Sequence, residues 1–535
     1  MPAVPESRPA GRAGIPPCLA YGNSWHLDTL AAGPTRLRQQ LISNQTGESV
    51  RFDVDEEYKI LIGGEWVSTS NHYDIIDPNT TKVVGHAPES TVQQANDAAV
   101  AAKAALKGWK NTSMAQRCEL LRKAAALLER RLPALAGLVQ AETGATINVA
   151  ETMQLPVCLE RFNYYKVPQD LDEPLKPYAM RATALGPAGL QNAMIYRQPV
   201  GVVAAITPYN FPLTSVAGKI APALAMGNTV IIKPAPQDPL AVIRFVEILD
   251  EVGFPPGVIN LIVGSGPDAG AALVDSKLVD MVSFTGSSLI GSKIIEQGAR
   301  TMKRNLLELG GKGAFIMTAD CDIAKAVSGI ASTWTLHSGQ ICTAPTRVIV
   351  HRSIHARTID MLSAAAKVLK VGDALERDTI VGPLVTKSQR DRVISMIARG
   401  VKEGATVAMG GDAPDRVGYF VNPTLLVDVQ PDDYVVQEEF FGPVVVVVAF
   451  DDEEQAVDIA NNSDYGLFSY VHTGDLSRGL ELAKQLESGT VVINGVQPHQ
   501  HAAFGGFKMS GLGRDRGVFG LHAYSEFQTV NWAAV

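Results

Sequence analysis

The chain has 535 residues, of which 46% are apolar, and a formal net charge of −8 at pH 7. This length exceeds what one hydrophobic core usually organises, so we expect two or more domains. The acidic balance, without a Lys/Arg cluster, argues against a nucleic-acid-binding protein, and no apolar run reaches the ~18 residues that a membrane-spanning helix needs.

The N-terminal segment, residues 1–57, is expected to be a disordered extension. Prolines crowd its first positions and its arginines are scattered, so it has no amphipathic pattern. It also lacks the apolar stretch of a secretory signal. A transit peptide is the weaker alternative, because Asp28 and Glu48 interrupt the segment.

Regular structure is predicted to begin with a β-hairpin over Tyr58–Val67, in which two apolar runs flank Gly63-Gly64. Two alanine-rich amphipathic helices follow, near Thr91–Leu106 and Ala115–Ala136. They are predicted because leucines and alanines recur there at three- and four-residue spacing.

From Val200 onward, short apolar strands alternate with helices. This pattern predicts a parallel sheet covered by helices on both faces. The strands are expected at Val202–Ile206, Thr229–Lys233, Ile259–Val263, Met281–Phe284 and Asn305–Leu309, and the helices at Leu240–Val252 and Ser288–Ala299.

After Lys312 a second alternating series predicts a second α/β domain. Its strands are expected near Phe315 and at Val348–Val350, Val444–Phe450, Ser469–His472 and Val491–Asn494. Two β-rich pieces, Thr183–Tyr196 and Ala523–Val535, fit neither series and could form a separate hairpin or arm.

Two glycine turns follow strands of the first series. Gly264–Gly270 has the spacing GxGxxxG, one residue longer than the dinucleotide fingerprint, so alone it is a weak signal. Phe284–Ser287 links a strand to a helix start, where backbone N–H groups can bind phosphate oxygens. Each turn taken alone could equally be an ordinary strand-to-helix connection. Two such turns in one parallel sheet favour a nucleotide-binding site. Lys233 closes a strand at the sheet edge where ligands bind, although a lone lysine there is usually only solvated.

Cys342 is the candidate nucleophile. The five cysteines are too scattered for a zinc site or a disulfide framework, so no metal is expected and a cytoplasmic location is favoured. Free cysteine is usually buried and inert, yet Cys342 lies in a polar stretch that begins at Ser338. A helix start at this point would lower the pKa of the thiol.

Glu308 and Asn210 are the candidate base and oxyanion donor. Most carboxylates at strand ends are exposed and structural, but burial of Glu308 near a thiol would raise its pKa toward that of a useful base. Prolines on both sides of Asn210 stiffen its loop, and a fixed amide suits a developing oxyanion. From the local sequence alone, an Asx-turn residue is the simpler interpretation. His499 and His501 could bind a metal but have no partner cluster, so we interpret them as loop residues near a pocket mouth.

Together these segments resemble the aldehyde dehydrogenase superfamily. Six of its signatures occur in the family's order and approximate spacing, from about Tyr58 to the C-terminus. They are the Cys342 segment, Leu307–Lys312, Pro208–Pro212, Phe284–Ser287, Gln437–Val444 and Phe504–Arg514.

The resemblance implies an α/β fold with a Rossmann-like cofactor domain, a second α/β catalytic domain and a β oligomerisation arm. The cofactor domain would comprise 58–178 and 201–311, and the catalytic domain 312–505. Residues 179–200 and 506–535 would form the arm and the C-terminal segment. A homodimer or homotetramer is expected.

The resemblance also implies oxidation of an aldehyde to a carboxylic acid with NAD or NADP. Cys342 would attack the aldehyde carbon, and Asn210 with the backbone N–H of Cys342 would hold the thiohemiacetal oxyanion. After hydride passes to the nicotinamide, Glu308 would activate the water that hydrolyses the thioester.

The remaining site residues are implied by family position alone. Those expected around the cofactor are Ile206, Thr207, Lys233, Pro236, Gly266, Gly270, Phe284, Thr285, Gly286, Ser287, Leu309, Glu439 and Phe441. Those expected around the substrate are Phe211, Ser215, Gly218, Leu336, Ile341, Thr343 and Pro498. Small residues at 215 and 218 predict a roomy pocket suited to aromatic or long aliphatic aldehydes.

Two departures from the family pattern matter. NAD-preferring members often carry Glu three residues after the lysine, where this chain has Pro236. Without that carboxylate, Lys233 could pair with a 2′-phosphate, so NADP or dual use is open. Asp515 stands where Glu is common, and its shorter side chain puts a proton-relay role there in doubt.

Two other functions compete. A CoA-acylating relative would transfer the acyl group to CoA, but that branch can dispense with the base that Glu308 supplies. A non-catalytic binding protein on the same fold is disfavoured by the joint presence of Cys342, Glu308 and Asn210.

Overall fold

The computed structural model describes residues 53–533. The predicted extension therefore lies outside the described residues as far as position 52. Among residues 53–533, no helix has the length and apolarity that crossing a membrane requires.

The first sheet is built around five parallel strands, β9-β8-β7-β10-β11. The hairpin of β1 and β2 extends it at one edge, and β21 from the C-terminal segment joins antiparallel at the other. Gly63 and Gly64 have φ of 64° and 92°, the left-handed backbone that a two-residue hairpin turn requires, so the predicted hairpin is confirmed. The strands are β1 (Ile60–Ile62), β2 (Glu65–Val67), β7 (Val202–Ile206), β8 (Thr229–Lys233), β9 (Ile259–Leu261), β10 (Met281–Thr285), β11 (Arg304–Glu308) and β21 (Gly511–Leu512).

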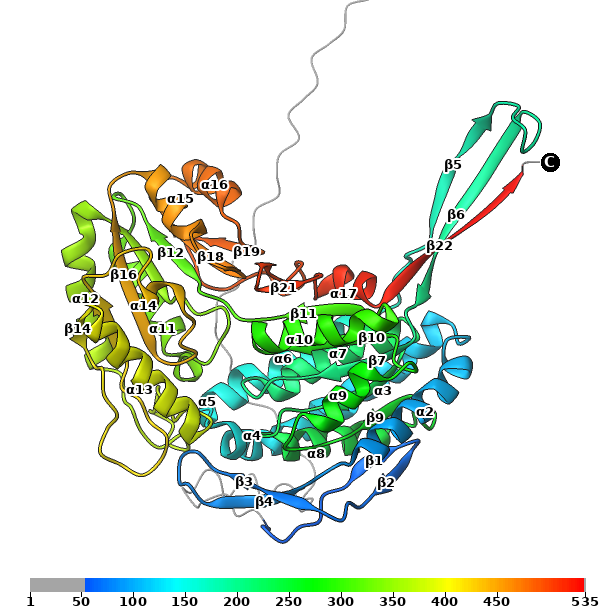
Figure 1. The fold of residues 1–535 in the computed structure, drawn as a ribbon, viewed down its shortest axis with the longest axis horizontal. Coiled ribbons are helices and arrows are strands. Elements are labelled where there is room, and N and C mark those ends of the chain that lie inside the picture. Colours follow the sequence, from blue (N-terminus) through cyan, green and yellow to red (C-terminus); the bar gives the residue numbers. More distant parts are fainter. Residues whose placement is uncertain (1–52, 534–535) are drawn as a thin grey trace, which may run out of the picture. The chain divides into compact units, whose positions relative to one another are not determined.

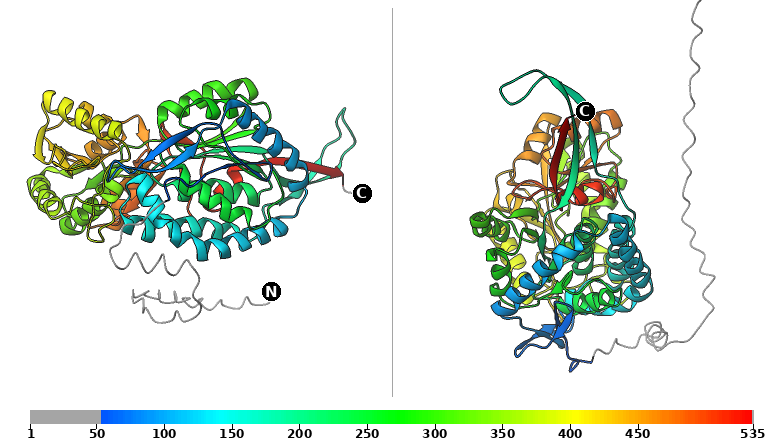
Figure 2. Two further views of the ribbon diagram at one scale, coloured as in Figure 1. Left: turned by 90° about the horizontal axis from the view of Figure 1, so that it is seen from below. Right: turned by 90° about the vertical axis from the view of Figure 1, so that its right-hand side faces the viewer.

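Helices cover both faces of this sheet, as predicted (Figure 2). Val203 and Ala205 of β7 point into one apolar core, and Val202 and Ala204 into another, because successive strand residues face opposite sides. The first core is closed by α3 (Met114–Arg131), α4 (Ala136–Thr143), α6 (Leu155–Tyr165), α7 (Pro212–Ala225) and α8 (Pro239–Asp250), and the other face by α2 (Val92–Trp109), α9 (Asp268–Asp275) and α10 (Ser288–Gly298).

Two predicted elements end earlier than expected. The helix predicted to reach Ala136 stops at Arg131, because Pro133 cannot continue it, and a 3-10 turn, η1 (Leu132–Leu135), intervenes before α4. The strand predicted to reach Val263 stops at Leu261. Val263 instead exchanges hydrogen bonds with Ser90, which draws the chain away from the sheet.

The second sheet has seven strands in the order β14-β15-β16-β13-β12-β18-β19. Its apolar run Val444–Phe450 is fully strand, as predicted. The strands are β12 (Ala314–Met317), β13 (Arg347–His351), β14 (Thr406–Met409), β15 (Thr424–Val427), β16 (Val444–Phe450), β18 (Phe468–His472) and β19 (Thr490–Ile493). Its helices are α11 (Ile323–Trp334) and α12 (His355–Lys367) on one face, and α13 (Lys387–Lys402), α14 (Tyr434–Gln437), α15 (Glu453–Asn461) and α16 (Leu476–Gln485) on the other.

The two β-rich pieces that fitted neither series form one antiparallel sheet that stands out from the rest of the described chain (Figure 1). Its order is β22-β6-β5, and α17 (Gly517–Ala523) leads into β22. The expected domain boundary at residue 178 falls inside β5, a strand that its two prolines had hidden from prediction. The strands are β5 (Glu173–Met180), β6 (Gly189–Pro199) and β22 (Ser525–Ala533).

Short elements complete the described chain. Two strand pairs are β3 (His72–Ile76) with β4 (Val83–Pro88), and β17 (Tyr465–Gly466) with β20 (Phe507–Lys508). The others are α5 (Ile147–Val149), the π-helical turn η2 (Ala150–Gln154), and the 3-10 turns η3 (Ala299–Thr301), η4 (Leu336–Gly339) and η5 (Arg352–Ile354).

Candidate active site

Cys342 lies in the loop between η4 and β13, and the residue as a whole is partly exposed although its sulfur is buried. No helix begins at this position, so the expectation that a helix start lowers its pKa is wrong. Burial of the sulfur raises the pKa of the Cys342 thiol to about 12, and the carboxylates of Glu439 and Glu308 raise it further. Arg516 opposes that shift.

The backbone before Cys342 is held in a strained shape. His337, Ser338 and Gly339 have φ of 48°, 56° and 75°, a left-handed run that two of these residue types rarely adopt. A Cβ at Gly339 would lie 2.2 Å from the carbonyl oxygen of Gly442, so only glycine allows this approach. A hydrogen bond fixes this loop to a neighbouring segment: Ser338 Oγ donates to the Gly382 carbonyl at 2.8 Å.

Asn210 lies in the loop after β7, and its side chain is buried. Its Nδ2 donates to the carbonyl of Gln340 at 2.8 Å, which brings the amide to the Cys342 loop. Its Oδ1 accepts from the Phe211 N–H at 3.1 Å, which fixes the orientation of the amide. One of the two Nδ2 hydrogens therefore stays free for a further acceptor.

Glu308 ends β11 and is only 5% exposed. Within the described residues neither of its carboxylate oxygens has a hydrogen-bond partner. Burial holds the pKa of Glu308 well above its usual value, and the nearby carboxylate of Asp515 adds to the rise against opposing charges of Lys219, Arg516 and Arg514. A carboxylate whose pKa is raised and that has no fixed partner is a stronger base toward water than an ordinary surface carboxylate.

Glycines bring the Glu308 strand and the Cys342 loop together. A Cβ at Gly311 would lie 2.3 Å from the Cys342 carbonyl oxygen, and one at Gly313 would lie 2.4 Å from that of Ala344. The connection from β11 to β12 can therefore press directly against the nucleophile loop. This close approach explains why the carboxylate of Glu308 raises the pKa of the Cys342 thiol.

The expected cofactor residues at strand ends lie along one sheet edge. Ile206 pairs with Lys233 and with Phe284, and Thr285 pairs with Glu308, so the carboxyl ends of four strands are in register. Thr207 follows directly, and its buried hydroxyl has no partner among the described residues. Lys233 is buried and donates to the carbonyls of Pro234 (3.2 Å) and Gly264 (3.3 Å).

The two glycine turns differ in what they leave open. Nothing lies within 4 Å of a Cβ placed at Gly266, whereas one at Gly270 would touch the Lys233 stem at 3.4 Å. At Gly286 a Cβ would collide with the ring of Phe284, so this turn requires glycine. Ser287 caps α10, with its Oγ accepting from the Ile290 N–H at 3.4 Å.

Glu439, Phe441 and Leu309 gather near the nucleophile loop. Glu439 accepts from the Gly311 N–H at 2.8 Å, and burial raises its pKa to about 7. The ring of Phe441, whose φ is 52°, meets that of Tyr209 edge to face at 5.9 Å. Leu309 is buried beneath α10.

A dinucleotide fits this edge. The open space at Gly266, the unpartnered Thr207 hydroxyl and the ammonium of Lys233 offer room and donors. Pro236 lines a cavity of about 530 Å³ into which β3 and the start of α13 also project residues. The hydroxyl of Tyr73, another lining residue, is buried without a partner among the described residues.

The expected substrate residues are not all brought together. Phe211 immediately precedes α7, and Ser215 and Gly218 lie on that helix. The ring centre of Phe211 is 5.5 Å from that of buried His337. Arg161 Nε and Asp515 Oδ2 lie 4.0 and 3.8 Å from a Cβ placed at Gly218, so charged groups occupy part of the room it leaves. Leu336, Ile341 and Thr343 lie around Cys342, and the Thr343 carbonyl accepts from Tyr470.

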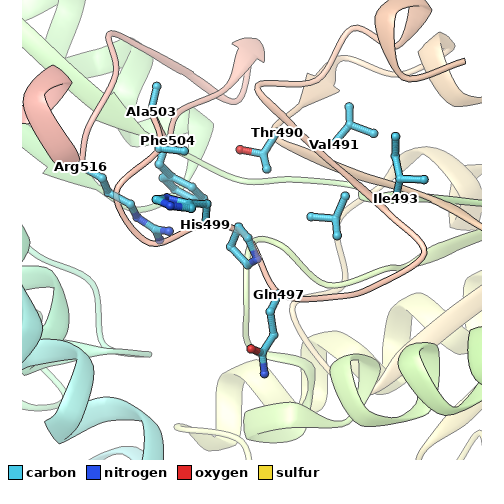
Figure 3. A pocket seen from close by; sticks show the side chains of 11 residues that line it. Thr490, Val491, Ile493, Gln497, His499, Ala503, Phe504 and Arg516 are labelled. Carbon is cyan, nitrogen blue, oxygen red and sulfur yellow. The ribbon is translucent and has the colours of Figure 1, made fainter. Parts of the chain in front are cut away.

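Pro498 instead lines a separate pocket of about 300 Å³ between β19 and the loop 497–504. None of the other six expected substrate residues lines it. Figure 3 shows Arg516 extending beside Phe504 and His499 at this pocket. His499 and His501 form no group of three metal-ligating side chains, and residues 53–533 contain none elsewhere.

Two functional residues were missed in the sequence. Lys219 is buried on α7, donates to Ser283 Oγ at 3.1 Å, and its charge acts on Glu308. The sequence did contain a signal for Lys219, because a lysine inside the apolar run Val216–Ala225 would be costly to bury without a partner. Arg516 has φ 68° and ψ 157°, a strained backbone, and its guanidinium lies 3.9 Å from the Phe504 ring centre.

The fold and this cluster define a class of enzyme: a nucleotide-dependent oxidoreductase that works through a covalent cysteine. The family model described as "Aldehyde dehydrogenase family" matches residues 66–530. The chain belongs to the aldehyde dehydrogenase family. It is an NAD(P)-dependent enzyme that oxidises an aldehyde to a carboxylic acid.

Similar proteins cover nearly the whole described chain. A 3-succinoylsemialdehyde-pyridine dehydrogenase of Pseudomonas sp is 38% identical over 88% of this chain and 98% of its own length. A chloroplastic betaine aldehyde dehydrogenase of Beta vulgaris is 37% identical, with 88% and 95% covered. The NAD+ complex of an aldehyde dehydrogenase from Bacillus cereus has a TM-score of 0.84 at 37% identity and covers 90% of this chain and 97% of that one. The predicted α/β fold is confirmed.

The charges around Cys342 predict how fast it reacts. Glu439→Gln should lower the pKa of the thiol and speed its alkylation by iodoacetamide, whereas Arg516→Leu should raise that pKa and slow it. Near pH ~8.5, where Glu439 is ionised, we expect changes of about two- to tenfold, since one pKa unit alters the thiolate fraction tenfold. Peptide mass spectrometry would follow Cys342 in the cofactor-free enzyme.

The neighbouring exposed Glu438 supplies the control, because Glu438→Gln removes a carboxylate that does not act on the thiol. Equal rates for Glu439→Gln and Arg516→Leu would contradict this electrostatic account.

Proposed function

We propose that Cys342, Asn210 and Glu308 carry out the aldehyde oxidation, on NAD or NADP held along the carboxyl ends of the first sheet. The observation that carries this proposal is the 2.8 Å hydrogen bond from Asn210 Nδ2 to the carbonyl of Gln340. It joins the loop after β7 to the loop of Cys342, and the charge of buried Glu308 acts on the same thiol.

Cys342 opens the reaction. Its thiol gives up its proton to solvent, the sulfur bonds to the aldehyde carbon, and the carbonyl oxygen takes the electron pair of the broken π bond. The free Nδ2 hydrogen of Asn210 and the backbone N–H of Cys342 donate to that oxyanion. Because Asn210 is already fixed through Gln340 and Phe211, the donor needs little rearrangement as charge develops.

The cofactor, when bound, supplies the acceptor for the hydride that leaves the substrate carbon. The residues proposed to hold it are Lys233 and Pro236 at the adenosine ribose, Gly266, Gly270, Gly286 and Ser287 at the adenine and pyrophosphate, and Glu439 with Phe441 at the nicotinamide ribose. Ile206, Thr207, Phe284, Thr285 and Leu309 complete the floor at the strand ends.

Glu308 completes the cycle. It takes a proton from water while the water oxygen attacks the acyl carbon, and the carbon–sulfur bond breaks to release the acid and the thiol. Its raised pKa suits this role, because a carboxylate with an ordinary pKa is a weak base at neutral pH. Lys219 and Asp515 act on Glu308 with opposite charges and tune that pKa.

This base also separates the proposal from its rivals. A CoA-acylating enzyme needs no water-activating carboxylate, and a non-catalytic protein needs no unpartnered buried acid beside a thiol. Acid formation from an aldehyde without CoA distinguishes the three.

Replacing the nucleophile tests the first step. Cys342→Ala should reduce aldehyde oxidation by at least about a thousandfold, because no other described cysteine is exposed to replace the thiol. The measurement is reduced-cofactor absorbance at 340 nm under saturating aldehyde. Cys321→Ala, which removes a buried cysteine away from the site, should keep activity; substantial turnover by Cys342→Ala would exclude this nucleophile.

Replacing the base separates the two half-reactions. Glu308→Gln should still give a burst of about one reduced cofactor per active site and then stop, because the thioester forms but is not hydrolysed. Stopped-flow absorbance with acid-quench mass spectrometry would detect the acylated Cys342 peptide. Loss of the burst as well would assign Glu308 an earlier role.

We further propose a homodimer or homotetramer built through the arm. Large apolar side chains are exposed on β5, β6 and β22, and the outer edges of β5 and β22 are unpaired in the described chain. An unpaired apolar strand invites pairing with another sheet edge, and β19 offers one at the end of the second sheet. The exposed residues are Leu175, Tyr178, Met180, Leu190, Phe527, Val530 and Trp532.

A charge on the arm should weaken this assembly. Tyr178 is 72% exposed, and Tyr178→Glu would place a charge there that is costly to bury in an interface. Sedimentation of this variant should therefore shift toward the 57.0 kDa monomer. Val417→Glu, a change of similar exposure (67%) outside the arm, is the control. A wild-type enzyme that sediments as a monomer would rule out the assembly.

A cytoplasmic location is proposed as well, since the four described cysteines are all free thiols, typical of a reducing compartment. Related proteins bear chloroplastic, mitochondrial and peroxisomal names, so an organelle is the alternative.

A further inference from the structure

The missing carboxylate at position 236 left the choice between NAD and NADP open. Pro236 cannot accept from a ribose hydroxyl or repel a 2′-phosphate, and Lys233 beside it is a cation. On the sequence alone, this corner therefore looks permissive for NADP.

A carboxylate from a different element lies at the same corner. Glu89 follows β4, and both of its carboxylate oxygens approach the backbone N–H of Ser265, at 3.1 and 3.0 Å. Ser265 lines the 530 Å³ cavity with Pro236, and the carbonyl of the preceding Gly264 accepts from Lys233 Nζ at 3.3 Å. Glu89 and Lys233 thus hold opposite sides of one backbone turn.

The position of Glu89 is fixed by the backbone on both sides. Its N–H donates to the Asn71 carbonyl, and the next residue, Ser90, exchanges two hydrogen bonds with Val263. These hydrogen bonds attach the hairpin of β3 and β4 to the chain after β9. The carboxylate is therefore part of the rigid turn rather than a free surface group.

Glu89 keeps acceptor capacity for a ligand. A carboxylate offers about four lone-pair sites, and the N–H of Ser265, shared between both oxygens, uses one site on each, so about two stay open. Lys233, in contrast, has spent two of its three N–H donors on backbone carbonyls. One remaining donor suits a hydroxyl oxygen but serves a phosphate dianion poorly.

The other charges around the cavity are also unfavourable to a phosphate. Asp74 and Asp391 line it together with Lys387, but Lys387 is already bonded to Asp391 at 2.7 Å. Asp74 is bonded to His86 at 2.9 Å. With Glu89 added, negative side chains predominate where a 2′-phosphate would have to lie.

We propose that Glu89 replaces the absent carboxylate of position 236: it accepts from a hydroxyl of the adenosine ribose, excludes a 2′-phosphate and makes this enzyme prefer NAD to NADP. This inference rests on the proposed function, in that Lys233 and the Gly264–Gly270 turn bind the adenosine end of the cofactor. It adds a specificity-determining residue that lies outside the cofactor-binding motifs.

Glu89→Gln tests the charge without removing the contact. The amide oxygen of glutamine can still accept from Ser265, so a residue that only holds the turn would leave cofactor choice unchanged. Calorimetry with the full-length enzyme would give Kd for NAD, NADP, ADP-ribose and its 2′-phosphate. We expect the wild type to bind NAD at least about tenfold more tightly than NADP, and Glu89→Gln to reduce that ratio by about tenfold, the factor set by 1.4 kcal/mol.

Asp74→Asn is the matched control, because it removes a carboxylate that lines the same cavity but is bonded to His86. It should change the ratio by less than about threefold, or 0.7 kcal/mol. Equal binding of NAD and NADP by the wild type would overturn the inference without any variant, and so would an unchanged ratio in a folded Glu89→Gln. Intact NAD preference in an enzyme that oxidises no aldehyde would instead overturn the proposed function alone.

Discussion

The hydrogen bond between Asn210 and the carbonyl of Gln340 is the contact on which the active site depends. It connects a loop at the carboxyl end of the first sheet to the strained loop of Cys342, which belongs to the second sheet. Glycines at 311, 313 and 339 let the surrounding backbone close to distances that any side chain would prevent. The proposed chemistry therefore arises where loops of two different sheets meet, and each sheet supplies only part of it.

Burial then sets the pKa values of the ionisable groups where the two loops meet. It raises the pKa of the Glu308 carboxyl group and of the Cys342 thiol together, because burial disfavours the charged form of each group. Each would also repel charge on the other. A proton can leave the thiol most easily when the carboxyl group receives it or when a cation such as Arg516 compensates. The pair is thus better suited to alternate in charge than to be charged at once.

Much of this arrangement could be predicted from the sequence, for local reasons. The strands Val202–Ile206 and Thr229–Lys233 are continuous apolar runs buried on both faces, and their bounds match the structure. The exposed strand β5 carries two prolines and no alternation, so its pattern gave no signal. Among the proposed site residues, Cys342, Asn210 and Glu308 have distinctive neighbours, but Glu89, Lys219 and Arg516 interact with residues far along the chain. Single-sequence patterns do not contain such contacts, and the environment that raises the thiol pKa is of the same kind.

The edge strand β21 connects the strand that carries Glu308 to the segment that leads into the arm. It pairs with β11 at Leu307 and Glu308, and Gly511 approaches that strand too closely for any side chain. The same segment continues through α17 into β22, the strand that carries exposed apolar residues on the arm. The arm is therefore covalently continuous with the strand that pairs beside Glu308. In this fold, the proposed assembly surface and the proposed base lie on one path of continuous backbone and strand pairing.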